Sequence, residues 1–536
     1  MTTWAVKLRG EDVYLGAATR EASDRPYYLR PPWRSLYSDR YETMVVRLTC
    51  DDGTVGWGEC LAPVGPEVPK AIVDRLIAPI LLDAGPLPPA GAGYAGAGYA
   101  GYAGAGYAGH AGATGHAGAA GAGQGHTGAG AGAGNRGAGR AGAGQDDTGA
   151  GAGAGHTGAG RAGADAGHTG PGHTGAGHTG AGHTGAGRGG ADAGHAGPGH
   201  TGAGPGHTGA GAGAGHAGAG AGHAGAGAGH AGAGAGHAGA GSFGVDPRAV
   251  RPWWARLSGL MRERGHLGGH QADALAAVDI ALWDLAGKAA GLPVHALLGG
   301  AFRQAVPTYV SGLPVPDNAA RAELARKWLA DGATHVKLHL GHGVDEDLAA
   351  YDAVAATGIR VAVDAHWAYD LAGALRLGRA LDERGAWFLE APLAPEDLDG
   401  HRELAAALVT PVAVGETMRH RYEFRQWLQA RALDLAQPDV GRTGITEAMA
   451  IAELASAFHV PVAPHHSVGL GVVLAAGLHV AAAIEAMPAF EFQPGPFPVA
   501  NRILTTPLTG GPGSFPLPTA PGLGVDVDIS ALVEDQ

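Results

Sequence analysis

Residues 360–366 read RVAVDAH, a short apolar run that ends on Asp364 and His366. An apolar run of this length is consistent with a buried strand. Comparable runs lie before and after it, separated by helical sequence such as AAYDAVAATG and AMAIAELASAF. In chain order they are VPTYVSG near 306, HVKLHL near 335, WFLEAPL near 387, VAVGE near 412, LDLAQPDV near 433, VPVAPHH near 460 and FEFQ near 490. Together these make eight strands alternating with helices, which predicts an α/β fold built on a parallel barrel.

Nearly every predicted strand ends on a side chain that can take part in chemistry. In order along the chain these residues are Lys337, His339, Asp364, His366, Glu390, Glu416, Asp439, His465 and Glu491. Barrel enzymes build their active sites from the carboxyl ends of the strands. We therefore expect these side chains to surround one pocket.

Three of them, Asp364, Glu390 and Glu416, follow one another at intervals of 26 residues, which is one strand and one helix. They should converge from adjacent strands, and three buried anions repel one another unless a hard divalent cation lies among them. No cysteine or cluster of histidines competes for such a site, so we expect one Mg²⁺ per subunit. Any one of these carboxylates could equally be a solvated strand end. The equal spacing of all three favours a metal site.

Composition limits the class of protein. Of 536 residues, 98 are glycine, and most of this excess lies in a Gly/Ala/His-rich tract over residues 88–241, with units such as HTGAG. This tract lacks large apolar side chains, so we expect it to be disordered, although its histidines leave open a metal-binding or assembly function. The net charge of −13 predicts no nucleic-acid partner, and no apolar run is long enough to predict membrane insertion. Cys50 and Cys60 are the only cysteines, which is typical of a cytoplasmic protein.

The remaining sequence divides into four further parts. The first contains YETMVVRLTCDDGTVGWGEC, a predicted hairpin, and a helix after it. The second contains ALAAVDIALWDLAGKAAG, which we interpret as a strongly amphipathic helix ending at Gly291. The predicted parts are residues 1–87 and 242–300 for a smaller domain, 301–495 for the barrel, and 496–536 for a C-terminal segment.

Taken together, these motifs resemble the enolase superfamily, in its mandelate racemase subgroup. The matching stretches are GWGEC, AVDIALWDLAGK, VKLHL, the three carboxylates, QPDV, APHHS and PGLGVDVD. The resemblance implies an α+β capping domain, made by the N-terminal segment and the C-terminal tail, over a (β/α)7β modified TIM barrel. It implies Mg²⁺ held by Asp364, Glu390 and Glu416, and removal of a proton α to a carboxylate. We also expect a homo-oligomer.

The same resemblance suggests roles for the other strand-end residues. His465 fits the base, and Asp439 would fix its tautomer and raise its basicity. Glu491 matches a final-strand glutamate that hydrogen-bonds the developing enediolate. The racemase-like Lys-x-Lys pattern is incomplete here, because Lys337 is followed by His339. Lys337 remains a candidate to bind the substrate carboxylate, and His339 could itself be a base.

The residue two positions after the metal aspartate points to a reaction type. Many relatives have asparagine there, whereas this chain has His366, and strand periodicity predicts that it shares a face with Asp364. In sugar-acid dehydratases that resemble galactonate dehydratase, a histidine at this position protonates the departing 3-hydroxyl. We therefore expect an acid-sugar dehydratase that forms a 2-keto-3-deoxy acid. A racemase, epimerase or cycloisomerase is the alternative, and His366 could instead support a metal-bound water.

The substrate is expected to be a small carboxylate, most simply a sugar acid. The capping segment over residues 20–42 is rich in Arg, Tyr and Trp, side chains that hold polar sugar acids. Arg30, Arg34 and Tyr37 are candidates for substrate binding, with a solvated surface loop as the alternative for each. His466 should point away from the pocket because it alternates with His465.

Overall fold

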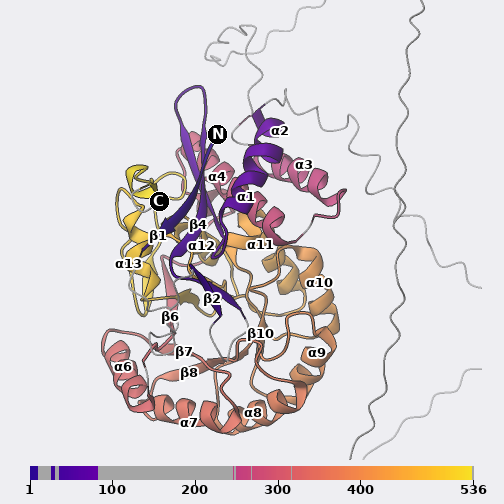
Figure 1. The fold of residues 1–536 in the computed structure, drawn as a ribbon, viewed down its shortest axis with the longest axis vertical. Helices are drawn as coiled ribbons and strands as arrows, with labels where there is room; N and C mark the ends of the chain where they lie inside the picture. The colour runs from indigo at the N-terminus through magenta and orange to yellow at the C-terminus, as the bar shows by residue number, and fades with distance from the viewer. Residues whose placement is uncertain are drawn as a thin grey trace, which may run out of the picture. The chain divides into compact units, whose positions relative to one another are not determined.

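Parallel strands alternate with helices from β6 (Ala305–Ser311) to β12 (Phe490–Phe492) in the computed structural model (Figure 1). The sheet order is β11-β10-β9-β8-β7-β6-β12. The strands between the two ends are β7 (His335–His339), β8 (Arg360–Asp364), β9 (Leu389–Glu390), β10 (Val412–Val414) and β11 (Leu435–Ala436). The residues described are 1–9, 26–29, 35–82, 246, 249–266, 268–315 and 317–533. The tract predicted to be disordered, 88–241, falls outside them.

The seventh predicted strand, VPVAPHH, is reduced to two isolated parallel bridges. Val462 pairs with Ala436, and His465 pairs with Asp439. The backbone N–H of Val462 donates to the carbonyl of Ala486, just before β12, at 2.9 Å. This segment therefore lies between β11 and β12 and closes the ring. The predicted (β/α)7β barrel is confirmed, although its seventh strand is only a short contact.

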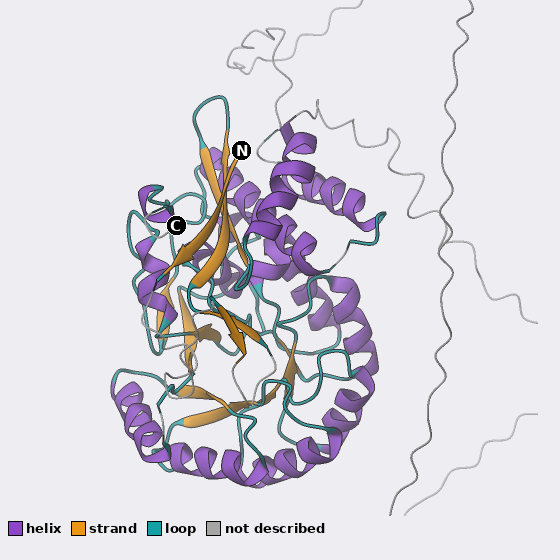
Figure 2. Ribbon diagram, viewed as in Figure 1, coloured by secondary structure: helices purple, strands orange, loops and turns teal. Residues whose placement is uncertain are grey.

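Helices cover the outside of the strands in an arc (Figure 2). Four of them begin at aspartates whose side chains accept a backbone N–H of the first turn, namely Asp317, Asp370, Asp397 and Asp439. Such caps satisfy donors that the helix itself leaves unpaired. The barrel helices are α6 (Asn318–Ala330), α7 (Val344–Ala355), α8 (Leu371–Arg384), α9 (Leu398–Ala407), α10 (Arg421–Ala430), α11 (Val440–Ala457) and α12 (Gly471–Ala483).

A three-stranded antiparallel sheet, ordered β1-β4-β5, forms the core of the capping part. The predicted hairpin is present as β4 (Tyr41–Thr49) and β5 (Val55–Leu61), with Gly53 at a φ of +86° in the turn. The other capping elements are β1 (Thr2–Leu8), β2 (Tyr27–Leu29), β3 (Leu36–Ser38), α1 (Glu67–Ile72), the π-helix η2 (Val73–Ile77), α2 (Ala78–Leu82), α3 (Val250–Arg262) and α4 (Gly269–Ala290). Shorter elements complete the chain: α5 (Val294–Leu297), α13 (Pro496–Arg502), β13 (Ser514–Pro516) and the 3-10 helix η3 (Ser530–Leu532). Among the described residues, no helix is both long and apolar enough to span a bilayer.

Helix α4 is not the amphipathic helix that the sequence suggested. Every residue from Asp273 to Gly287 is buried, because β5 packs on one side of the helix and α11 packs on another. A helix enclosed in this way has no solvent-facing stripe, so its polar residues must be hydrogen-bonded instead. Asp284 accepts backbone N–H groups from Trp57 at 2.8 Å and from Leu523 of the C-terminal tail at 2.7 Å. The predicted end of α4 at Gly291 is confirmed, with a left-handed φ of 67°.

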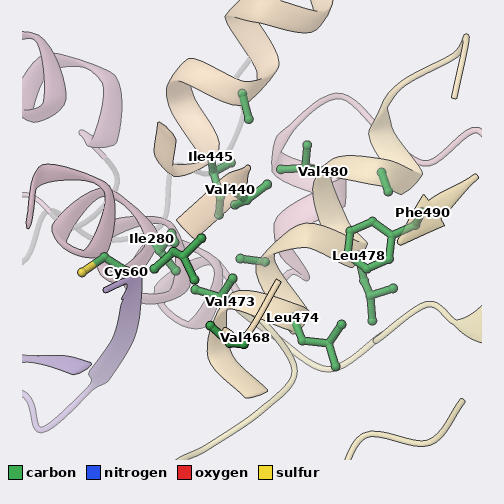
Figure 3. Packing of buried hydrophobic residues seen from close by; sticks show 14 of the residues in the cluster. Cys60, Ile280, Val440, Ile445, Val468, Val473, Leu474, Leu478, Val480 and Phe490 are labelled. Carbon is green, nitrogen blue, oxygen red and sulfur yellow. The ribbon is translucent and has the colours of Figure 1, made fainter. Parts of the chain in front are cut away.

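Glu59 joins the capping sheet to the barrel. Its carboxylate accepts the backbone N–H groups of Leu470 at 2.6 Å and Val473 at 3.0 Å, at the start of α12. Burial raises the pKa of Glu59 to about 7, and these hydrogen bonds oppose the rise. Apolar residues from β5, α4, α11, α12, the segment before α12, and β12 pack in the cluster that contains this junction (Figure 3). The labelled members are Cys60, Ile280, Val440, Ile445, Val468, Val473, Leu474, Leu478, Val480 and Phe490.

The glycines of the GWGE motif allow β5 to lie directly on the backbone of α4. A Cβ added at Gly58 would lie 1.9 Å from the carbonyl oxygen of Ala277, and one at Gly56 would lie 2.3 Å from that of Ala281. Both obstacles are backbone atoms, which cannot rotate away as a flexible side chain would. These two positions therefore require glycine because of close approach rather than unusual backbone angles.

We predict that Gly58→Ala lowers the free energy of unfolding by about 3 kcal/mol, because the strand and the helix must separate to admit the methyl group. Gly259→Ala is the matched control, since its added Cβ would meet nothing within 4 Å in the middle of a helix. That change should be neutral or stabilising, by up to about 1 kcal/mol. Urea unfolding of both variants measures the difference, and equal stability would contradict this packing.

Candidate active site

A cavity of about 230 Å³ opens at the carboxyl ends of the barrel strands. Barrel residues form its floor, and the capping segment from Ser35 to Tyr41 forms part of its wall. The structure brings most of the predicted residues to this cavity. Those that line it are Tyr37, Lys337, His339, Asp364, His366, Glu416, His465 and Glu491. Glu390 borders a smaller adjoining void, and Asp439 lies behind His465.

Lys337 lies at the centre of the charged groups and is only 1% exposed. Its Nζ lies 2.8 Å from Glu390 Oε1, 2.9 Å from Glu491 Oε1 and 3.8 Å from Asp364 Oδ2. Burial alone would lower the pKa of Lys337, but Glu390 and Glu491 raise it well above its usual value. The ammonium group is therefore charged, and it compensates several buried carboxylates at once.

Glu390 retains excess negative charge around it. Its Oε2 accepts a hydrogen bond from Gln437 Nε2 at 2.7 Å, while its Oε1 faces Lys337. Burial raises the pKa of Glu390 to about 8, and although Lys337 acts against the rise, Asp364 and Glu491 add to it. A further positive charge at this position would favour the ionised carboxylate.

His465 is held between two carboxylates. Its Nδ1 lies 2.6 Å from Asp439 Oδ2, and its Nε2 lies 2.9 Å from Glu416 Oε2. Asp439 is itself fixed because it caps α11 by accepting the N–H of Gly441 at 2.8 Å. Burial acts to lower the pKa of His465, but Glu416, Glu491 and Asp439 raise it well above the ordinary value. Burial likewise acts to raise the pKa of Glu416, yet His465 lowers it to about 2.

The donor groups fit a hard divalent cation. Glu390, Glu416 and His465 each offer one ligand atom, and these atoms lie within 4.8 Å of one another. Asp364 is outside this group, although it pairs in register with Glu390 on the neighbouring strand. Carboxylate oxygens are the ligands that Mg²⁺ prefers, and a cation would oppose the burial and the neighbouring carboxylates that raise the pKa of Glu390. The three-carboxylate set itself remains a prediction.

His366 reaches the cavity by a different route from the predicted one. Strand β8 ends at Asp364, and both His366 and Trp367 have left-handed backbone angles, with φ of 48° and 57°. The turn is held by the N–H of His366, which donates to Asp364 Oδ1 at 2.9 Å. Strand alternation therefore predicted the correct location for the wrong reason. The ring nitrogen Nε2 of His366 lies 2.9 Å from the hydroxyl of Tyr37 on the capping segment.

The other predicted residues fall into distinct environments. Burial lowers the pKa of His339 to about 4, so its imidazole is neutral near neutral pH, and Nε2 lies 3.6 Å from Asp364 Oδ2. Burial acts to raise the pKa of Glu491, but Lys337 and His465 hold it well below its usual range. As a carboxylate, Glu491 needs a proton before it can donate a hydrogen bond. His466 stacks on Phe490 and does not line the cavity, as predicted. Arg30 and Arg34 lie outside the described residues.

Three residues of the site were missed in the sequence. Gln437 contacts Glu390, and it could have been found because it precedes Asp439 by two positions in QPDV. The ring of Tyr309 faces Lys337 Nζ at 5.8 Å, but on its strand it reads as an ordinary core residue. Arg442 lines the cavity three residues after Asp439.

Comparisons with known proteins agree with this architecture. A family model described as "Enolase C-terminal domain-like" matches residues 320–531, and one described as "Mandelate racemase / muconate lactonizing enzyme, N-terminal domain" matches residues 243–299. The D-galactarolactone cycloisomerase of Agrobacterium fabrum is 36% identical, over 54% of this chain and 81% of that protein. The arabinonate dehydratase of Saccharolobus solfataricus is 34% identical, over 47% of this chain and 69% of that protein.

The chain is also similar to a further dehydratase and to a solved structure. The D-galactonate dehydratase of Ralstonia nicotianae is 34% identical, over 54% of this chain and 80% of that protein. The crystal structure of a putative isomerase from Sinorhizobium meliloti matches with a TM-score of 0.63 and 26% identity, over 99% of this chain and 96% of that one.

We predict that Lys337→Met destabilises the protein by about 3 kcal/mol at pH 8 in EDTA, because it leaves buried carboxylates without their cation. Lys327→Met is the matched control. Lys327 is 61% exposed and its partner Asp331 is one helical turn away, so its loss should cost about 0.5 kcal/mol or less. Urea unfolding compares the two. Similar losses for both variants would contradict the role given to Lys337.

Proposed function

This chain belongs to the enolase superfamily, in its mandelate racemase and muconate lactonizing enzyme group, and we propose that it is a hydro-lyase that removes water from a sugar acid. The observation that carries the proposal is one cavity in which His366 and His465, besides His339, approach from the ends of different barrel strands. His465 is paired with Asp439, and His366 lies beyond β8. Relatives named arabinonate dehydratase and D-galactonate dehydratase support the same class of reaction.

The residues that would hold a Mg²⁺ ion are Asp364, Glu390 and Glu416. When bound, the ion would supply Lewis-acid stabilisation of the negative charge that develops on the substrate carboxylate. Lys337, which is charged and buried beside two of these residues, can orient the same carboxylate. These residues thereby fix which carbon of the substrate faces His465.

His465 is the proposed base. Asp439 binds Nδ1, so the Nε2 atom is the one aimed toward the cavity. Nε2 must be unprotonated to accept the proton from the α-carbon, so the ion pair between His465 and Glu416 has to open first. Asp439 then stabilises the imidazolium that forms, as the carboxylate partner does in other histidine–carboxylate pairs.

His366 is the proposed acid. Its Nε2 is at hydrogen-bonding distance from Tyr37, which places this ring nitrogen at the wall of the cavity rather than behind it. In the proposed step the protonated ring donates a proton from Nε2. Transfer of this proton to the 3-hydroxyl breaks the carbon–oxygen bond, and the hydroxyl leaves as water. The electron pair of the former α-carbon–hydrogen bond forms the double bond of an enol, which becomes the 2-keto-3-deoxy acid. His465 keeps the abstracted proton until it is returned to solvent.

A cycloisomerase or racemase is the second candidate. It is favoured by the 36% identical relative named D-galactarolactone cycloisomerase and by His339, a neutral imidazole in the same cavity. A neutral imidazole can accept a proton without first losing one. In this alternative His339 would be as important as His465, and no water would be lost.

The first experiment is a screen of aldonic and aldaric acids with Mg²⁺ for 2-keto acid formation. On the substrate found, His465→Asn should abolish both exchange of the α-proton with D₂O and water loss. His366→Asn should lower the rate of water loss by about 10²–10⁴-fold and keep α-proton exchange, because only the second step needs the acid. His295→Asn, which changes a histidine outside the cavity, is the control.

Two experimental results would contradict the proposal that the protein is a dehydratase. Exchange of the α-proton without any water loss in the wild-type protein would favour the racemase or cycloisomerase. Full dehydratase activity in His366→Asn would remove His366 from the mechanism. Nuclear magnetic resonance follows exchange and product formation in the same sample.

A further inference from the structure

Arg442 is a cation in the cavity that the proposed mechanism does not use. It follows Asp439 by one helical turn at the start of α11, and it lines the same cavity as Lys337 and His465. Its Nε atom is buried without a hydrogen-bond acceptor, and no hydrogen bond or ion pair of its guanidinium occurs among the described residues. Buried donors without partners are rare in proteins, and each calls for an explanation such as a catalytic role or a bound group that supplies the acceptor.

The acidic residue Asp273 near Arg442 does not form an ion pair with its guanidinium group. Asp273 lies within the electrostatic influence of Arg442, but its carboxylate is already paired with Arg419, whose Nε lies 3.1 Å from Oδ1. Gly441, next to Arg442, packs closely against Leu61 of the capping sheet. Arg442 therefore follows a close contact between barrel and cap, and the cavity that it lines also has apolar lining residues, among them Leu61, Pro63 and Val468. Apolar surroundings strengthen a charge-assisted hydrogen bond.

The position of Arg442 in the barrel separates it from Lys337. Lys337 is on β7, whereas Arg442 follows β11, and these strands are four places apart in the order β11-β10-β9-β8-β7. In a ring of eight strands, positions four apart lie on opposite sides. The strand that carries Lys337 and the strand that precedes Arg442 thus lie on facing sides of the barrel, and both residues line the one cavity.

We propose that Arg442 binds a second carboxylate, so that the substrate is a sugar diacid rather than a sugar monoacid. This inference rests on the proposed function, because that function places the reacting carboxylate of the substrate near Lys337. A planar guanidinium can pair with a carboxylate through two parallel hydrogen bonds. A neutral hydroxyl at the far end of a monoacid would leave the cation unneutralised, so the site discriminates between the two ends of otherwise identical molecules.

A binding experiment tests Arg442 without requiring any reaction. Adipate and hexanoate have chains of equal length but carry two carboxylates and one carboxylate. Isothermal titration in Mg²⁺ should show that adipate binds to the wild-type protein about 10- to 100-fold more tightly than hexanoate. Arg442→Gln should remove this preference, and Arg442→Lys should keep part of it because the charge remains.

Arg40→Gln is the matched control, because Arg40 is an arginine of the capping segment that lines the same cavity. The preference for adipate should persist in this variant. Circular dichroism and the melting temperature confirm that each variant is folded. The inference is overturned if wild type binds both acids equally, if Arg442→Gln keeps the preference, or if Arg40→Gln removes it.

Activity then separates this inference from the proposed function. For an aldarate and the aldonate of the same configuration, the ratio of kcat/KM values should favour the aldarate, and Arg442→Gln should lower that ratio about 10- to 100-fold. If neither acid is dehydrated but the Arg442-dependent preference for adipate is found, the proposed function fails and the diacid site stands. If both acids are dehydrated equally and the ratio is unaffected by Arg442→Gln, the function stands and the diacid site fails.

Discussion

The contact between Lys337 and its carboxylates is the constraint on which the site depends. Glu390, Glu491 and Asp364 are all buried, and a fold cannot hold so many negative charges together without compensation. The single ammonium group lies at hydrogen-bonding distance from two of them. The pKa of Glu390 is nevertheless raised to about 8, because burial, together with Asp364 and Glu491, outweighs the opposing effect of Lys337. We infer that the remaining charge is what a divalent cation would neutralise. The chemistry proposed for this protein follows from that imbalance.

The capping part is attached to the barrel and supplies part of the cavity wall. Glu59 binds the start of α12 and Asp284 binds both β5 and the C-terminal tail, so the capping sheet is fixed to the barrel by buried hydrogen bonds. In the attached cap, Tyr37 lies against His366 at one wall of the cavity, and Leu61 packs against Gly441, the residue before Arg442. The barrel therefore supplies the reacting groups, whereas the junction of barrel and cap determines which molecules fit between them.

The sequence predicted the barrel and most of the cavity, because a buried parallel strand is recognisable as a short apolar run. The polar residues that follow such runs then lie together at the carboxyl ends of the strands. It failed where backbone geometry, not residue type, decided the outcome. Periodicity cannot show the left-handed turn at His366. Polar residues in the sequence of α4 suggested a solvent-facing side, but Asp273 and Asp284 are buried and accept hydrogen bonds from other parts of the protein. Arg442 was missed because an arginine after a strand usually faces solvent, and only the structure shows it in the cavity.

The most direct test of the account is a crystal structure of the protein grown with Mn²⁺ in place of Mg²⁺. An anomalous difference map should show one strong peak at the carboxyl ends of β8, β9 and β10, bound by oxygens of Asp364, Glu390 and Glu416. Glu416 should then have left Nε2 of His465, which would face the open cavity. A peak elsewhere, no peak at a saturating concentration, or an ion bound without Asp364 would contradict the account.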